Sequence, residues 1–147
     1  MPLGESFLRI LCVDDHPDTA DSLGIVLHLF GYESRICYDG ESALKMAEVF
    51  QPDVILLDLS MPGMKGDEVG RRLRSRPWAE NIPIVALSAF GDDEARRRTT
   101  EAGFDLHLVK PTAPDQLACL LTDLVISRGN AANAQRVRDS SFLISGD

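Results

Sequence analysis

The sequence has no long apolar run and no excess of positive charge, and each absence narrows the possible functions. None of its apolar segments approaches the roughly 18 residues of a membrane-spanning helix. The first residues place no basic segment ahead of an apolar run, so no secretory leader is predicted. Lys and Arg number 15 against 23 Asp and Glu, and the net charge of -8 repels the phosphates of nucleic acid and anionic membranes on average. We therefore expect a cytoplasmic protein that binds neither nucleic acid nor membrane directly.

Cysteine is also scarce. Cys12, Cys37 and Cys119 are an odd number of thiols, and each lies in an apolar segment. This pattern predicts reduced thiols in the core of a cytosolic protein, with a catalytic cysteine as the alternative. The 147 residues, 44% of them hydrophobic, suffice for one domain with a core and are too few for two ordinary domains.

The stretch 54–66 is the most informative part of the chain. It begins with the continuous apolar run Val54-Ile55-Leu56-Leu57, which is typical of a strand buried on both faces of a parallel sheet. Asp58 follows at the carboxyl end of this run, where open α/β sheets bind their ligands. Residues 61–66, Met-Pro-Gly-Met-Lys-Gly, favour a loop because proline lacks an N–H for the sheet and glycine favours turns. The pattern therefore predicts a carboxylate at the junction between a buried strand and a loop.

Strands and helices are predicted to alternate along the whole chain. Apolar runs predict strands at 7–13, 33–38, 54–57, 82–87 and 106–109. Each is followed by a segment with apolar residues at helical spacing, and the last of these helices is expected at 114–127. The first helix is expected to bury Leu23, Val26, Leu27 and Phe30. Five such repeats predict a doubly wound α/β fold, a parallel sheet with helices on both faces.

Polar residues stand at the carboxyl ends of four of these strands. They are Asp14 and Asp15, Asp58, Ser88 and Lys110. Because parallel strands all point the same way, the five side chains are expected to meet at one edge of the sheet. Clustered carboxylates favour a hard cation such as Mg²⁺, and Asp58 beside an ammonium and a hydroxyl is suited to attack a phosphoryl group. The alternative for any single acid is a helix cap or a solvated loop residue.

The same positions carry a family resemblance. The chain resembles the receiver domain of two-component response regulators, in particular chemotaxis regulators, through Val13-Asp14-Asp15, Asp58 with Met61-Pro62-Gly63-Met64 and Gly66, Ser88-Ala89, and Lys110-Pro111. The resemblance implies a flavodoxin-like five-stranded parallel sheet of order 2-1-3-4-5 with five helices. A receiver domain is then expected at 7–127. Residues 128–147, small and polar, are expected to form a flexible tail.

The resemblance also implies a role for each site residue. Asp58 would accept a phosphoryl group from a phosphohistidine of a sensor histidine kinase or phosphotransfer protein. Asp15 and Asp58 would bind Mg²⁺ directly together with the backbone carbonyl of Ser60, and Asp14 would act through water. Lys110 would pair with the phosphoryl group.

Further residues are expected to set the response to phosphorylation. Ser88 would turn inward to bond the phosphoryl group, together with a switch residue at His107, where the family usually has Tyr or Phe. A partly exposed strand histidine without a switch role is the alternative. Ser60 and Phe90 stand where the family sets the lifetime of the phosphorylated state. The Lys110-Pro111 peptide bond is expected to be cis.

The resemblance implies that output runs through the fourth helix, fifth strand and fifth helix, to a downstream protein or a dimer mate. The clusters Arg71-Arg72, Arg74, Arg76 and Arg96-Arg97-Arg98 are expected on solvated helix faces, with a partner-binding role as the alternative. We expect a stand-alone receiver with no enzymatic activity beyond self-phosphorylation and autodephosphorylation.

Two other interpretations remain open. One is a phosphorelay intermediate or a receiver cut from a hybrid kinase, which passes the phosphoryl group onward. The other is a Mg²⁺-dependent aspartyl-phosphate phosphohydrolase. That class carries a second acid two residues after its nucleophile, where this chain has Ser60, and this difference disfavours turnover.

Overall fold

The computed structural model describes residues 8–89, 93–110 and 113–129. Within these ranges, five strands and five α-helices alternate, with a short 3₁₀ helix, η2, before the fourth strand. Their bounds are β1 Arg9–Val13, α1 Pro17–Leu29, β2 Glu33–Cys37, α2 Gly40–Phe50, β3 Val54–Asp58, α3 Gly66–Arg74, η2 Pro77–Ala79, β4 Ile84–Ser88, α4 Asp93–Glu101, β5 Leu106–Val109 and α5 Pro114–Gly129. No helix in these ranges is long and apolar enough to cross a membrane.

The strands form one sheet in the order β2-β1-β3-β4-β5, and all neighbours are parallel. The predicted flavodoxin-like order is therefore confirmed. β3 lies at the centre and all five of its residues are buried, as its continuous apolar sequence predicted. The strand that carries Asp58 is thus fully buried, as is its neighbour β4.

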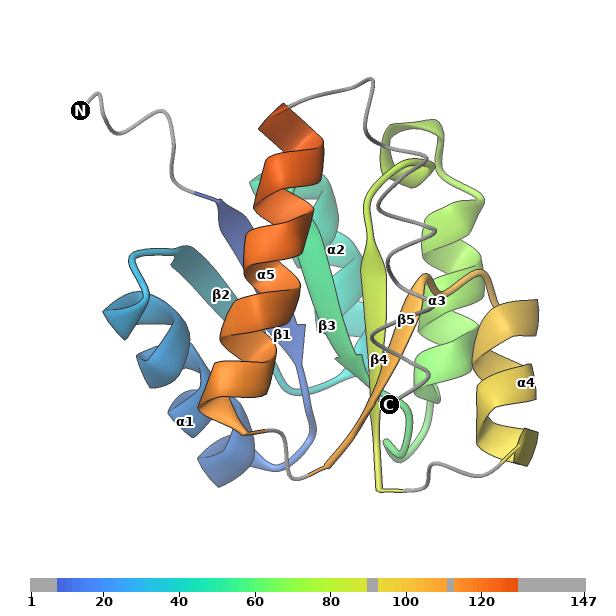
Figure 1. The fold of residues 1–147 in the computed structure, drawn as a ribbon. Helices are drawn as coiled ribbons and strands as arrows, with labels where there is room; N and C mark the ends of the chain where they lie inside the picture. The colour runs from blue at the N-terminus through green and yellow to red at the C-terminus, as the bar shows by residue number, and fades with distance from the viewer. Residues whose placement is uncertain (1–7, 90–92, 111–112, 130–147) are drawn as a thin grey trace.

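Helices cover both faces of the sheet (Figure 1), and the buried apolar side chains form two clusters, one on each face. Successive residues of β1 alternate between them, with Ile10 and Cys12 in one layer and Leu11 and Val13 in the other. The first layer is completed by α1 and α5, and the second by α2 and α3. α4 lies at the edge of the molecule, beyond β5 (Figure 1).

Local signals set the helix ends as the sequence predicted. Asp39 caps α2 because its carboxylate accepts a hydrogen bond of 2.8 Å from the backbone N–H of Ser42. Gly31 ends the α1 segment with φ of 93°, a conformation that glycine adopts without steric cost. The last helix, α5, continues to Gly129, two residues beyond the predicted end. Residues 130–147 of the expected tail lie outside the described residues.

Two burial predictions are wrong. All three cysteines are free thiols, but only Cys12 and Cys37 are buried, whereas Cys119 is exposed. The core-facing side of α5 is formed by Leu117, Leu120, Leu121 and Leu124, and at 3.6 residues per turn Cys119 points away from it. Phe30 is 38% exposed, because it follows the last residue of α1 and packs edge-on against Tyr32 instead of entering the core.

Arg74 also departs from the predicted solvated face of α3. Its guanidinium donates hydrogen bonds of 2.7–2.8 Å to the carbonyls of Ala79, Ile82 and Gly103. It also pairs with Asp105, whose carboxylate accepts a second hydrogen bond from the backbone N–H of Ile84. Arg74 therefore ties the end of α3 to η2, to the start of β4 and to the turn before β5.

Candidate functional site

The predicted polar residues meet at the carboxyl edge of the sheet. Asp14 follows β1, Asp58 ends β3, Ser88 ends β4 and Lys110 follows β5. Asp14, Asp58 and Ser88 are each at most 2% exposed. The Lys110 ammonium lies 2.8 Å from Asp14 Oδ2 and 3.3 Å from Asp58 Oδ1. The backbone N–H of Lys110 bonds the carbonyl of Ser88 at 2.7 Å. The expected convergence is confirmed for Asp14, Asp58 and Lys110, and the amine lies between the two carboxylates.

The two oxygens of Asp58 have different surroundings. Oδ1 accepts a hydrogen bond of 3.2 Å from the backbone N–H of Ser60 and faces Lys110. Oδ2 is buried and has no hydrogen-bond partner among the residues that the structure describes. A buried carboxylate oxygen normally finds a partner, because leaving it unpaired costs free energy. Oδ2 is therefore the oxygen positioned to bind a cation or to attack an incoming group.

The loop after β3 closes tightly behind Asp58. A Cβ atom added at Gly66 would lie within 2.2 Å of the Asp58 carbonyl oxygen, so only glycine fits there. The backbone N–H of Gly66 bonds the carbonyl of Leu59 at 3.2 Å, and Leu59 and Met61 are buried. These contacts hold the loop, and the helix start that follows it, against the end of the central strand.

Burial and charge act in opposite directions on the site. Burial raises the pKa of Asp58 to about 6, and the nearby charge of Lys110 only partly opposes it. Burial also acts to raise the pKa of Asp14, but hydrogen bonds from Lys110 and from the His16 backbone outweigh burial and lower it. Burial disfavours the charged form of Lys110, yet the two carboxylates keep its pKa above the ordinary value. Lys110 is therefore an ammonium group at neutral pH.

The acidic residues could hold a metal ion, and the structure adds a residue that the sequence analysis missed. One ligand atom each from Asp14, Asp15, His16 and Asp58 lies within 4.8 Å of the others. Three carboxylates with an unpaired buried oxygen suit a divalent cation. His16 was overlooked because it lies between two acids and Pro17, in a segment that predicts only a helix start. Its position directly after the acid pair was the available signal.

The remaining predicted site residues have mixed outcomes. His107 is 8% exposed and lies on β5 beside Ala86 of β4, so the alternative of a partly exposed histidine is wrong. Its switch role with Ser88 stays a prediction. Ser60 is exposed two residues after Asp58, and the contact of its carbonyl with Mg²⁺ stays a prediction. Phe90, and the Lys110-Pro111 bond through its proline, lie outside the described residues.

The basic clusters are largely occupied by neighbouring acids. Arg97 pairs with Glu94 on α4 at 2.7 Å. Arg98 reaches Asp67 on α3 at 3.4 Å, and Asp67 also pairs with Arg71 at 3.5 Å. These contacts connect α4 to the first turn of α3, which follows the Asp58 loop. The arginine-bearing faces of α3 and α4, which were expected to be solvated, are therefore joined to each other through Asp67.

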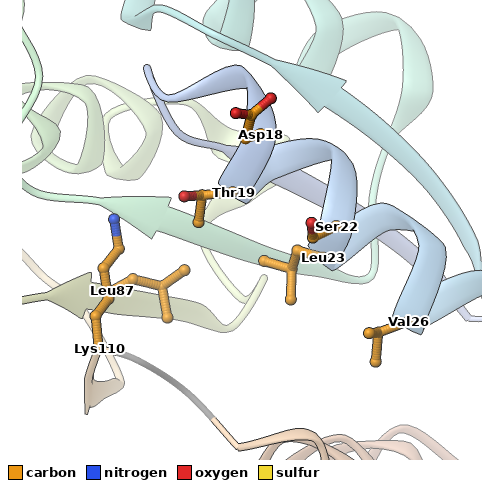
Figure 2. Close-up of a pocket in the computed structure, with 7 residues that line it drawn as sticks. All are labelled: Asp18, Thr19, Ser22, Leu23, Val26, Leu87 and Lys110. Atoms are coloured by element: carbon orange, nitrogen blue, oxygen red, sulfur yellow. The ribbon is translucent and has the colours of Figure 1, made fainter.

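A pocket of about 600 Å³ reaches the site from the side of α1. Leu23 and Val26 of α1 and Leu87 of β4 form its apolar part, whereas Asp18, Thr19, Ser22 and Lys110 are polar. Figure 2 shows Leu87 and Lys110 at the strand ends facing the side chains of α1, with the Lys110 amine toward Thr19. The pocket provides an open approach to the amine that contacts Asp58.

Comparison with known proteins identifies the family. A profile of the response regulator receiver domain matches residues 10–122. The chain belongs to this family. It is 40% identical over 109 residues to the DNA-binding response regulator MtrA of Mycolicibacterium smegmatis, across 74% of this chain and 46% of MtrA. The receiver therefore spans about half the length of that relative.

Solved receivers have the same fold. The chemotaxis protein CheY4 of Vibrio cholerae superposes with a TM-score of 0.78 at 30% identity, over 80% of this chain and 98% of that chain. The receiver domain of the sensor histidine kinase PA1611 of Pseudomonas aeruginosa superposes with a TM-score of 0.76 at 28% identity, over 81% and 98%. Its structure has a magnesium ion coordinated in the active site cleft.

Proposed function

We propose that this receiver is a phosphorylation-controlled switch that accepts a phosphoryl group on Asp58 with Mg²⁺ bound. The observation that carries the proposal is the buried, unpaired Oδ2 of Asp58 beside the ammonium of Lys110. An acceptor carboxylate needs a free oxygen and nearby positive charge that stabilises the phosphoryl oxygens in the transition state. Asp58 and Lys110 meet both requirements.

Each residue then has a defined task. An oxygen of Asp58 forms a bond to the phosphorus of a donor phosphohistidine as the P–N bond breaks and the imidazole leaves. Lys110 balances the charge of the phosphoryl group, for which it must exchange part of its contact with Asp14. The hydroxyl of Ser88 would then bond a phosphoryl oxygen and draw the β4 end inward. His107, on the neighbouring strand, would move with it.

Mg²⁺ would be held by Asp15, Asp58 and the backbone carbonyl of Ser60, with Asp14 acting through water. The bound ion supplies positive charge for the phosphoryl oxygens during transfer. The similarity to the PA1611 receiver and the close group of Asp14, Asp15 and Asp58 support this assignment. Ser60, which bonds Asp58 and stands close to the acceptor, and Phe90 would set how fast water removes the phosphoryl group.

Two different surfaces would bind the two kinds of partner. A histidine kinase or phosphotransfer protein would approach along the pocket beside α1, which leads to Lys110. A downstream protein or a dimer mate would bind α4, β5 and α5, where the Arg98 to Asp67 contact joins α4 to α3. The protein would act in the cytoplasm, without direct contact to nucleic acid or membrane and without catalytic turnover of a separate substrate.

The similarity to the chemotaxis protein CheY4 supports a stand-alone receiver. The similarity to the PA1611 receiver supports a second candidate, a hybrid-kinase or relay receiver that passes its phosphoryl group onward. The two candidates differ in how the phosphoryl group leaves the aspartate. A signalling receiver loses it to water, whereas a relay receiver transfers it to a histidine of another protein. The phosphohydrolase alternative remains disfavoured, because Ser60 stands in place of the second acid.

Intact-mass spectrometry tests the proposal. The protein is incubated with Mg²⁺ and acetyl phosphate, beside Asp58→Asn, a chelator control and Asp53→Asn, in which a carboxylate that contacts Arg9 is changed instead. We expect one phosphoryl adduct in the wild type and in Asp53→Asn, and none in Asp58→Asn or with chelator. An adduct that persists in Asp58→Asn would contradict the assignment of the acceptor.

A further inference from the structure

His16 is placed at the acidic cluster by the chain itself. It lies between the β1 end and Pro17, the first residue of α1, and its backbone N–H bonds Asp14 Oδ1 at 3.0 Å. This bond turns the imidazole back toward the carboxylates although the side chain is 69% exposed. The imidazole is therefore close to the site and largely exposed to solvent.

The distances around this nitrogen fit shared coordination. Nδ1 lies 3.3 Å from Asp14 Oδ1 and 3.2 Å from Asp15 Oδ1. Two neighbouring ligand atoms bound to one ion at about 2.0–2.2 Å lie about 2.8–3.6 Å apart in octahedral or tetrahedral geometry. The nitrogen and the two oxygens are thus spaced as neighbouring ligands of a single ion.

A second observation points to a cation at this place. Asp58 contributes the fourth member of the group, and its Oδ2 is buried without a hydrogen-bond partner among the described residues. Lys110 contacts only Asp14 Oδ2 and Asp58 Oδ1 in this cluster. The cluster thus holds three carboxylates, including Asp15, beside one ammonium group, so it retains negative charge for a divalent ion.

We infer that His16 is a metal ligand, and that the site binds divalent transition ions such as Zn²⁺ more tightly than three carboxylates alone would. The inference rests on the metal site of the proposed function. Imidazole nitrogen suits Zn²⁺, whereas Mg²⁺ prefers oxygen ligands and keeps several waters. His16 therefore strengthens Zn²⁺ binding selectively, and Zn²⁺ competes with Mg²⁺ for Asp15 and Asp58.

Isothermal titration calorimetry with Zn²⁺ and with Mg²⁺, at one pH, tests this inference on the full chain. The variants are His16→Ala and, as the matched control, His28→Ala at the other end of α1. We expect His16→Ala to weaken Zn²⁺ binding by about tenfold or more and Mg²⁺ binding by less than about threefold. His28→Ala changes neither. Thermal unfolding of the metal-free variants verifies that they are folded.

Imidazole nitrogen NMR provides a direct signature. Zn²⁺ is expected to shift the Nδ1 resonance of His16 in the wild type and to leave His28 unshifted. If Zn²⁺ binds the wild type and His16→Ala equally and Nδ1 does not shift, His16 is only a hydrogen-bonding neighbour and the inference is overturned, while the proposed Mg²⁺ site stands. If neither ion binds the wild type, the metal site of the proposed function is overturned with it.

Discussion

The ammonium nitrogen of Lys110 lies 2.8 Å from Oδ2 of Asp14, although the two residues are 96 positions apart in the chain. The contact joins the ends of β1 and β5, which are separated in the sheet by β3 and β4. It passes directly over the end of β3, so that the same nitrogen also lies 3.3 Å from Asp58. The fold therefore places one cation between a carboxylate that binds it and a carboxylate that is available to react.

Removing this cation should destabilise the protein. Lys110→Met leaves Asp14 and Asp58 buried together without a positive partner, and we expect it to lower the free energy of unfolding by about 1–3 kcal/mol without metal. Urea unfolding at pH 7.5 measures the change. Lys45→Met, at an exposed lysine of α2, is the control and should change stability by less than about 0.5 kcal/mol. Equal effects of the two substitutions would count against the role of Lys110.

Asp58 should make metal-free stability depend on pH. Its folded pKa of about 6 is raised above the ordinary value of 3.8, so the folded state binds the proton more tightly than the unfolded state. The charged carboxylate therefore destabilises the fold above pH 6, and this penalty disappears as pH falls toward 4. We expect Asp58→Asn to stabilise the protein by about 2–3 kcal/mol at pH 7.5 and by about 1 kcal/mol at pH 4.5.

Urea unfolding with chelator present, at both pH values, measures this difference. Asp58 makes few hydrogen bonds that asparagine would lose, since Ser60 N–H can bond the amide oxygen instead. A loss of stability in Asp58→Asn at pH 7.5 would show that the carboxylate stabilises the site, contrary to the direction expected from its burial.

Gly66 should be intolerant of a side chain. Alanine there places its Cβ within 2.2 Å of the Asp58 carbonyl, which is backbone and cannot move aside cheaply. We expect Gly66→Ala to lower the free energy of unfolding by about 2–3 kcal/mol. Gly31→Ala has φ of 93° but open space around the added carbon, so it should cost about 1 kcal/mol. A smaller loss for Gly66→Ala than for Gly31→Ala would contradict the close approach.

Arg74 should stabilise the fold without contacting the proposed phosphorylation site. Arg74→Gln removes hydrogen bonds to three backbone carbonyls and the pair with Asp105, and we expect a loss of about 2–4 kcal/mol. Arg72→Gln, which breaks only an exposed pair with Glu68, should cost less than about 0.5 kcal/mol. Thermal or urea unfolding distinguishes the two. Phosphorylation of folded Arg74→Gln should remain.

The sheet and the carboxylate cluster could be predicted because both follow from local patterns. Five apolar runs alternate with segments whose apolar residues have helical spacing. Parallel strands then bring Asp14, Asp58 and Lys110 to one edge of the sheet, independently of the loop conformations. The strand order itself came from the family resemblance. Cys119 was assigned to the core by its apolar neighbours, although the helical spacing of Leu117, Leu120 and Leu121 already placed it on the opposite side.

Arg74 could not be predicted from its surroundings in sequence. Its backbone acceptors are Ala79, Ile82 and Gly103, and the last is 29 residues away. Every residue has a backbone carbonyl, so the side-chain sequence does not indicate which carbonyls accept hydrogen bonds from an arginine. A cluster of arginines on a helix therefore predicts a solvent-exposed face. The exact oxygen of Asp58 that stays unpaired is likewise a property of side-chain geometry, which only the folded structure provides.

The central claim is that the Asp58 carboxylate receives the phosphoryl group, and chemical mapping tests it most directly. After incubation with Mg²⁺ and a phosphodonor, borohydride reduces an acyl phosphate of aspartate to homoserine, and peptide mass spectrometry locates the change. We expect homoserine at position 58 alone, dependent on Mg²⁺. Homoserine at position 14 or 15, or no reduction product in a protein that carries a phosphoryl adduct, would contradict the account.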